Sequence, residues 1–218
     1  MTYDEIKKNK EICECLRKGD ENLGVLGYTD HSAAHCTMVA KRAAYILKKF
    51  GYSEEDIELV KIAGFMHDIG NVINRSHHAE YGALLANELL KETDMTLEDR
   101  VTIVSAIGNH DESTGSPEDV ISAALIIADK TDVRRSRVRQ KERSAFDIHD
   151  RVNYAVTDSK LKVGEKKSEI ALNLQIDEKI CSMYDYFEIF LERMMLCRKA
   201  AEILGTTFKL TVNGRKVL

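Results

Sequence analysis

The chain has 218 residues, and its 36 acidic and 32 basic side chains give a net charge of −4. This length suits one domain, or one domain with a small appendage. With 44% hydrophobic residues, the chain can form a core without cross-links such as disulfide bonds. No apolar run approaches the roughly 20 residues that span a bilayer, and the first residues contain no hydrophobic leader. We therefore expect a cytoplasmic protein with no membrane partner. The slightly acidic charge disfavours a general nucleic-acid-binding protein.

The cysteine and proline content favours a reduced, helical protein. Five scattered cysteines form no C-x-x-C pair, so the sequence indicates neither a disulfide framework nor a zinc ribbon. Pro117 is the single proline, and long helices can therefore run without interruption.

Between residues 30 and 143 the apolar residues recur at intervals of three and four, which predicts amphipathic helices. One helix is expected over 30–50, with Gly51 as its C-terminal stop. Two more begin at the capping signals Ser53-x-x-Asp56 and Thr96-x-x-Asp99 and cover 53–69 and 96–110, and a further one covers 77–92. A last helix should begin at Ser116, with Pro117 in its first turn. This part of the chain is predicted to be an all-α bundle.

The pattern changes after residue 143. Alternating and β-branched residues over 152–163 and 169–176 predict a hairpin, with its turn at 162–167. A long helix is expected over 178–204 and should end at Gly205, before a second alternating stretch with an Asn213-Gly214 turn.

These elements predict a mainly α fold with three parts. Residues 1–29 form an N-terminal helical extension, residues 30–148 the helical bundle, and residues 149–218 a small α+β unit. The open strands of that last unit could pair across chains, which makes a homodimer a side prediction.

Six of the seven histidines fall in the helical segment. The central pair, His67-Asp68, ends an apolar helix, where two ionisable side chains are costly to bury without a partner. A metal ion would be a suitable partner. Adjacent helical residues point about 100° apart, so other helices must supply the remaining ligands. The available residues are His35, His78, His110 and Asp129.

Taken in order, these motifs resemble the HD-domain metal-dependent phosphohydrolases. The matching segments are His35-Cys-Thr-Met-Val-Ala40, Met66-His-Asp-Ile-Gly70 and Ile126-Ile-Ala-Asp-Lys-Thr-Asp132. Two further segments, at His78 and His110, look like the extra histidines of the binuclear members. The resemblance covers about residues 30–140 and implies an HD-domain helical bundle there.

The resemblance also implies a mechanism and a ligand set. One metal would be bound by His35, His67, Asp68 and Asp129, and Asp68 would bridge to a second metal held by His78 and His110. Asp68 and His67 are the predicted catalytic residues. Two divalent transition metals (Mn, Fe, Co, Ni or Zn) would make hydroxide available near pH 7 to attack a phosphoester or phosphoanhydride bond of a small nucleotide-like substrate.

Several nearby residues are suited to binding that substrate. His31 is expected one turn before His35 on the same helical face, and Lys130 follows Asp129. Residues 134–143 contain six basic side chains, of which Arg134 and Arg135 are the preferred substrate-binding residues. If the helix continues, Arg135, Arg139 and Arg143 would form a stripe along it. We interpret His77 as a neighbour of the site, and the second His-Asp pair, His149-Asp150, as structural.

The sequence leaves the substrate and some alternatives open. Asn71 and Asp111 stand where the branch that cleaves cyclic dinucleotides carries lysine and histidine, and Ile69-Gly-Asn71 lacks the acidic pair of the branch that hydrolyses guanosine tetraphosphate. Cleavage of dinucleoside tetraphosphates is compatible with the motifs. The alternatives are a single-strand nuclease that uses the arginine stripe, and a metal-binding sensory or scaffold protein that acts through residues 149–218.

Overall fold

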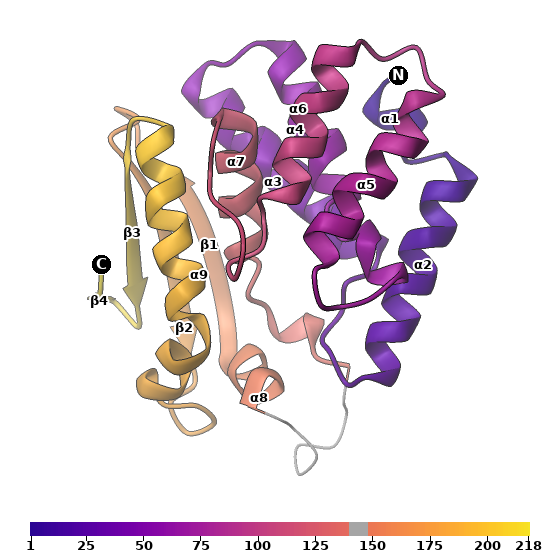
Figure 1. Ribbon diagram of the computed structural model, residues 1–218. Coiled ribbons are helices and arrows are strands. Elements are labelled where there is room, and N and C mark those ends of the chain that lie inside the picture. Colours follow the sequence, from indigo (N-terminus) through magenta and orange to yellow (C-terminus); the bar gives the residue numbers. More distant parts are fainter. Residues whose placement is uncertain (140–147) are drawn as a thin grey trace.

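A computed structural model describes residues 1–139 and 148–218 (Figure 1). The fold is mainly helical, with a small sheet near the C-terminus, as the sequence predicts. The helices of the first part are α1 (Tyr3–Ile6), α2 (Lys10–Val25), α3 (Ala33–Phe50), α4 (Glu54–Met66), α5 (His78–Lys91), α6 (Leu97–Gly108) and α7 (Val120–Lys130), with short 3₁₀ turns η1 (Ile69–Val72) and η2 (Arg135–Arg137).

Capping residues set the helix limits much as expected. The Ser53 hydroxyl accepts a hydrogen bond from the Asp56 amide at 3.0 Å, and Asp56 in turn binds the Ser53 amide, so α4 starts with a complete capping box. Thr96 caps α6 in the same position. Gly51 has φ 82°, a left-handed conformation that a glycine adopts without strain, and it ends α3.

Two predictions about α3 and α7 are wrong. Ser32 caps α3, so His31 precedes the helix and is not on its face. Asp119, and not Ser116, caps α7, because the Asp119 carboxylate accepts the Ser122 amide at 2.7 Å.

The predicted arginine stripe does not form either, because α7 ends at Lys130 and the chain turns before η2. Arg135 therefore lies in a separate 3₁₀ turn, and Arg139 lies beyond it without helical structure. Arg143 is outside the described residues.

The C-terminal unit combines α8 (Ile148–Ala155), α9 (Met183–Ile203) and a four-stranded sheet with the order β1-β2-β3-β4. The strands are β1 (Val156–Val163), β2 (Glu169–Ile176), β3 (Thr207–Val212) and β4 (Arg215–Lys216). The predicted β1–β2 hairpin is confirmed, and β2 pairs in parallel with β3 because α9 lies between them in the sequence. The strand predicted from residue 152 starts four residues later, since Val152–Ala155 belong to α8.

The helix α9 joins the two parts. It packs against α7 on one side and β3 on the other, as Figure 1 shows. Its side chains Tyr186, Phe190 and Met194 are fully buried in a hydrophobic core that continues into the helical bundle. The C-terminal unit therefore packs, through α9, against the helix whose last turn carries Asp129.

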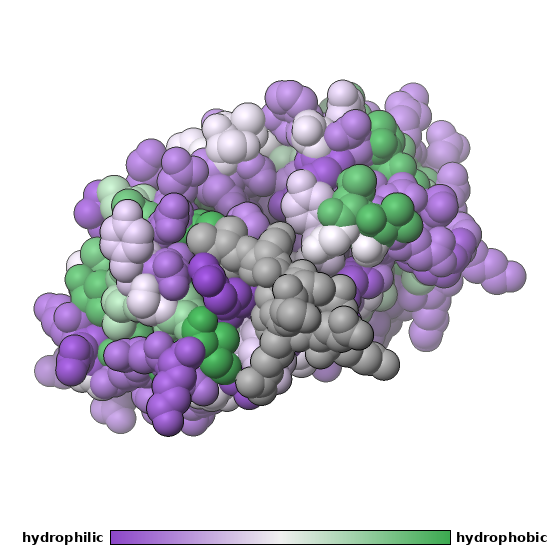
Figure 2. Space-filling view, turned by 90° about the horizontal axis from the view of Figure 1, so that it is seen from below, coloured by the Kyte–Doolittle hydropathy of each residue, from purple (hydrophilic) through white to green (hydrophobic). Residues whose placement is uncertain are grey.

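The surface in Figure 2 is mostly hydrophilic, with hydrophobic groups interrupted by polar residues. Val25 and Leu26 at the end of α2 are among the exposed hydrophobic side chains. Within the described parts of the chain, every helix is too short or too polar to cross a membrane.

Candidate metal centre

The structure brings the six predicted ligands together at the ends of five helices. The set comprises His35 in the first turn of α3, His67 and Asp68 after α4, His78 at the start of α5, His110 after α6 and Asp129 in the last turn of α7. All are buried except Asp129, whose side chain is 12% exposed.

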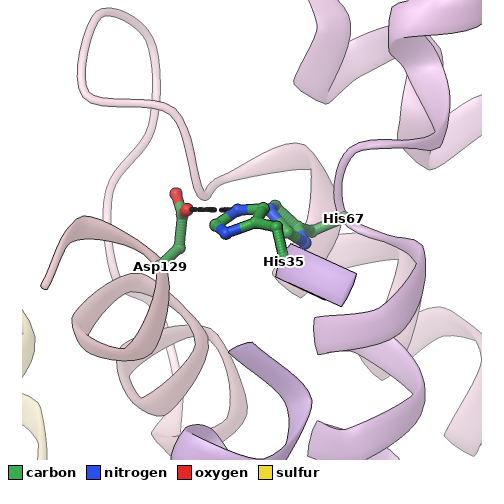
Figure 3. Close-up of side chains that lie close together, drawn as sticks. All are labelled: His35, His67 and Asp129. Atoms are coloured by element: carbon green, nitrogen blue, oxygen red, sulfur yellow. Dashed lines mark ion pairs between the residues drawn. The ribbon is translucent and has the colours of Figure 1, made fainter. Parts of the chain in front are cut away.

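The first group of ligands consists of His35, His67 and Asp129, which point toward one another in Figure 3. The Oδ1 atom of Asp129 lies 3.3 Å from His35 Nε2 and 3.6 Å from His67 Nε2. Asp68 adds its Oδ2 atom at 3.3 Å from His67 Nε2 and 3.7 Å from His35 Nε2. Two imidazole nitrogens and one carboxylate oxygen thus converge, and Asp68 Oδ2 lies within 3.7 Å of both nitrogens, so these four residues could supply the ligands of a four-coordinate metal.

A second group lies on the other side of Asp68 and contains His78 and His110. The Oδ1 atom of Asp68 is 3.8 Å from His78 Nε2, and the Nε2 atoms of His78 and His110 are 3.2 Å apart. The two carboxylate oxygens of Asp68 therefore face different ligand groups.

Each of the four imidazoles is held through Nδ1, which turns Nε2 toward the cluster. The acceptors are Asp132 Oδ2 for His35 (2.8 Å), Gly64 O for His67 (2.9 Å), Arg75 O for His78 (3.2 Å) and Ile107 O for His110 (2.6 Å). Carbonyl and carboxylate oxygens only accept hydrogen bonds, so Nδ1 carries the proton. In a neutral ring, Nε2 then presents a lone pair to the cluster, which is the usual state of a metal-binding histidine.

Several of these inward-facing atoms are unsatisfied. Nε2 of His35, Nε2 of His67 and Oδ2 of Asp68 are buried without a hydrogen-bond partner among the described residues. The neutral rings of His78 and His110 would direct two lone pairs at each other, which is unfavourable. Buried polar atoms of this kind cost free energy unless a ligand satisfies them. A divalent cation in each group would remove the cost, so these residues fit a metal.

The ionisation states also suit metal binding. Burial would raise the pKa values of Asp68 and Asp129, but neighbouring positive charges, above all His67 and Lys130 respectively, hold them well below their usual range. Burial lowers the pKa of His78 to about 4 and that of His110 to about 3. At neutral pH the carboxylates are therefore charged and these two rings are neutral, as metal ligands must be.

The pKa of His67 moves in the opposite direction. Burial lowers it, but the charges of Asp68 and Asp129 outweigh burial and raise it to about 10. A proton on His67 thus balances the two carboxylates when no cation does so.

Two glycines allow the ligand-bearing segments to approach one another. A Cβ atom at Gly64 would lie 2.8 Å from Ala40 Cα, so Gly64 lets α4 pack closely on α3. A Cβ atom at Gly70 would lie 2.0 Å from the His78 carbonyl oxygen. Side chains at these positions would push apart the helices that carry His35, His67 and His78.

Further residues orient the ligands. The Asn71 amide donates to Asp68 Oδ1 at 2.8 Å. Lys130 binds Asp129 Oδ2 at 2.9 Å and Glu112 Oε2 at 2.6 Å, and it is nearly buried. Lys130 is a predicted substrate-binding residue, and it lines the small pocket at the predicted ligands as well as binding the Asp129 carboxylate. Burial lowers the Lys130 pKa, but Asp129 and Glu112 outweigh burial and raise it overall.

The other predicted substrate residues occupy different positions. The His31 ring lies 5.7 Å from the His35 ring, and its Nδ1 donates to Thr29 O at 2.7 Å. Arg134 instead forms an ion pair with Asp132 at 2.6 Å, and Arg135 lies over the Tyr154 ring at 4.4 Å. His31 thus stays next to the ligands, and the two arginines bind protein groups.

Two other histidines lie outside the described ligand groups. His77 is exposed and lies 3.4 Å from Glu80, with its ring away from the cluster. His149 lies in the first turn of α8, outside the ligand groups.

Sequence reasoning missed several residues of the site. Asp132 anchors His35, and Arg75 and Arg137 line the pocket at the ligands. Asp132 could have been found, because it stands three residues after Asp129 in a matching motif. Arg75 stands outside the motifs, and Arg137 belongs to the basic run 134–143, in which nothing favours it over Arg134 and Arg135.

The family model of the HD domain matches residues 33–137. These residues form an HD domain. MJ1020, an uncharacterized protein of Methanocaldococcus jannaschii, is 29% identical over 195 residues, which cover 77% of this chain and 73% of that protein. MJ0778, another uncharacterized protein of the same organism, is 39% identical over 67 residues, covering 29% of this chain and 37% of that protein.

The HD domain gives the ligand cluster its chemical context. All six clustered residues fall inside it. HD domains bind divalent metals and belong to a family of metal-dependent phosphohydrolases, so the match and the buried His/Asp groups agree on a metal-binding domain of hydrolase type.

Proposed function

We propose that the protein is a phosphohydrolase with two divalent transition metals, which cleaves a phosphoester or phosphoanhydride bond of a nucleotide-like small molecule. The observation that carries this proposal is the orientation of Asp68. One of its oxygens faces His35 and His67, and the other faces His78. Divalent cations held there would activate water near neutral pH and neutralise charge on a phosphoryl group.

The residues of the chain have separate roles in this proposal. His35, His67 and Asp129 hold the first cation, His78 and His110 hold the second, and Asp68 is shared. Asn71 and Lys130 fix the two carboxylates so that their oxygens do not rotate away from the ligand positions. The mixture of imidazole and carboxylate donors suits Mn, Fe, Co, Ni or Zn better than Mg.

The substrate would enter beside the ligands. A pocket there is lined by His31, Arg75 and Arg137 as well as by Asp68 and His78. Arg75 NH1 lies 4.0 Å from Asp68 Oδ1, close enough to bind an oxygen of the reacting phosphoryl group. This pocket supports a small anionic substrate.

The described residues give the nuclease alternative less support than the small-molecule proposal. Of the arginines expected to contact a strand, Arg135 donates to the Tyr154 carbonyl and Arg139 forms an ion pair with Asp20. Dimerisation through residues 149–218 stays a prediction, and light scattering of the full chain would test it.

The proposed function is tested with the full chain loaded with Mn²⁺ and a mixed pool of nucleotides and dinucleotides, whose masses are followed over time. We expect the wild type to consume one class of phosphate compound and Asp68→Asn to lose more than about a hundredfold in rate, the upper range for outer-shell metal partners. Asp158→Asn on exposed β1 is the matched control and should keep full activity. Equal activity of Asp68→Asn and the wild type would contradict the proposal.

A further inference from the structure

A cavity of about 300 Å³ lies between the HD domain and the C-terminal unit. The HD side contributes His31, Arg75 and the nearby Arg137, and helices α8 and α9 contribute Asn153, Phe190 and Arg193. Its volume is at the lower end of the range for small-molecule sites, so it can take part of a small ligand.

This cavity adjoins the candidate metal centre. The smaller pocket at the ligands Asp68, His78 and Asp129 is also lined by His31, Arg75, Arg137 and Arg193. The same four side chains thus line both spaces. A molecule with one group at the metal ligands would extend past these side chains into the larger cavity.

The cavity is lined by three arginines, Arg75, Arg137 and Arg193, and by two carboxylates, Glu112 and Asp150. Arg137 donates to two backbone carbonyls, Asp30 O at 3.0 Å and Asp132 O at 3.1 Å. Glu112 is an ion-pair partner of Arg193 at 2.7 Å and also binds Lys130, so one carboxylate serves two cations. A wall of this kind attracts an anion, and guanidinium groups are suited to phosphate oxygens.

Arg193 is held by contacts from both parts of the chain. Its guanidinium lies 4.9 Å from the ring of Phe190, one turn earlier on α9, and its Nε donates to Glu112. The Arg193 side chain is 23% exposed and lines the cavity, and its described contact with Glu112 uses Nε. The position of this cation therefore depends on how α9 packs against the bundle.

We propose that the substrate carries a second phosphate group, and that Arg193 and Arg137 bind it while the first phosphate lies at the metal ligands. The inference rests on the proposed function and names its substrate class, an organic molecule with two linked phosphates such as a nucleoside diphosphate. The C-terminal unit then completes the substrate site.

The test measures binding and requires no turnover. Mn²⁺-loaded full-length protein is titrated calorimetrically with methylenebisphosphonate, which has two phosphonate groups, and with methylphosphonate, which has one. We expect the wild type to prefer the bisphosphonate, and Arg193→Gln to weaken its binding about tenfold or more while the affinity for methylphosphonate changes little. Arg198→Gln, on the exposed face of α9, is the matched control and should bind like the wild type.

A second variant changes the charge of the cavity and leaves Arg193 and its contact with Glu112 in place. Asn153→Asp is nearly isosteric and adds a negative charge to the cavity lining without replacing a member of the Glu112 ion pairs, so it should also weaken bisphosphonate binding selectively. Asn173→Asp, on β2, is its control. Metal content is measured in each sample, so that a loss of metal is recognised.

The outcomes separate this inference from the proposed function. Selective loss in both cavity variants supports the second phosphate site, whether or not any nucleotide is hydrolysed in the assay above. Equal affinities of the cavity variants and the wild type for the bisphosphonate would overturn the inference, even if the protein proves to be an active hydrolase. An equal loss for both phosphonates would also overturn it, because only the first phosphate position would then be affected.

Discussion

Replacing Asp132 by asparagine should weaken metal binding although Asp132 is not a ligand. Its Oδ2 accepts the Nδ1 proton of His35 at 2.8 Å and is fully buried. The negative charge makes the His35 ring a stronger donor to a metal, and asparagine keeps the shape but removes the charge. Loss of such an outer-shell partner costs about 10- to 100-fold in metal affinity, which is about 1.4 to 2.8 kcal/mol.

The assay is competition for Zn²⁺ against a chelator of known affinity, with circular dichroism as the check on folding. Arg134→Lys is the control, because Arg134 forms the other strong ion pair of Asp132 without touching His35. We expect the control to stay within about threefold of the wild type, since lysine keeps a positive charge beside Asp132 and the His35 contact is unchanged. Wild-type affinity in Asp132→Asn, or the same loss in both variants, would refute the role given to the Asp132–His35 contact.

Three further predictions concern pH, helix packing and the buried ion pairs. The pKa values of His78 and His110 are about 4 and 3, so the affinity for the second cation should change little between pH 7.5 and 5.5 and fall only below about pH 4. Two rings of ordinary pKa would each lower that affinity about tenfold by pH 5.5. Calorimetric titration with the metal at each pH distinguishes the two cases. Gly64→Ala should lower the free energy of unfolding by about 1 to 3 kcal/mol in chemical denaturation, because the new methyl group meets backbone, while Gly108→Ala, with only an ordinary contact, should be neutral or stabilising. Glu112→Gln removes the carboxylate that Lys130 and Arg193 share, and it should lower the free energy of unfolding by about 3 kcal/mol. An unchanged melting temperature would contradict this.

The sequence was sufficient to predict most helices and the ligand groups. Local signals determine these features: Ser53 with Asp56 closes a capping box, and Gly51 takes a left-handed conformation. The clustered residues were predicted because a His-Asp pair at the end of an apolar helix needs a partner, and because the ordered motifs resemble those of the HD-domain family.

Other features depend on contacts between distant segments. Nothing near Lys130 predicts that α7 ends there, so the arginine stripe was a reasonable but wrong extension of the helix. The apolar alternation at 152–155 fits a strand as well as the short helix that packing selects. Arg193 is 125 residues from Asp68 in the sequence, and only the folded chain places both at one pocket.

The central claim is that the clustered histidines and aspartates bind two metal ions, and counting metals tests it most directly. The full chain is saturated with Zn²⁺ or Mn²⁺, dialysed, and measured by mass spectrometry of its metal content, beside His110→Ala and the exposed control His77→Ala. We expect about two metals per chain in the wild type and in His77→Ala, and about one in His110→Ala, because the group of Asp68, His78 and His110 would lose a ligand. A wild-type protein that retains no metal, or a metal content that His110→Ala leaves unchanged, would contradict the account.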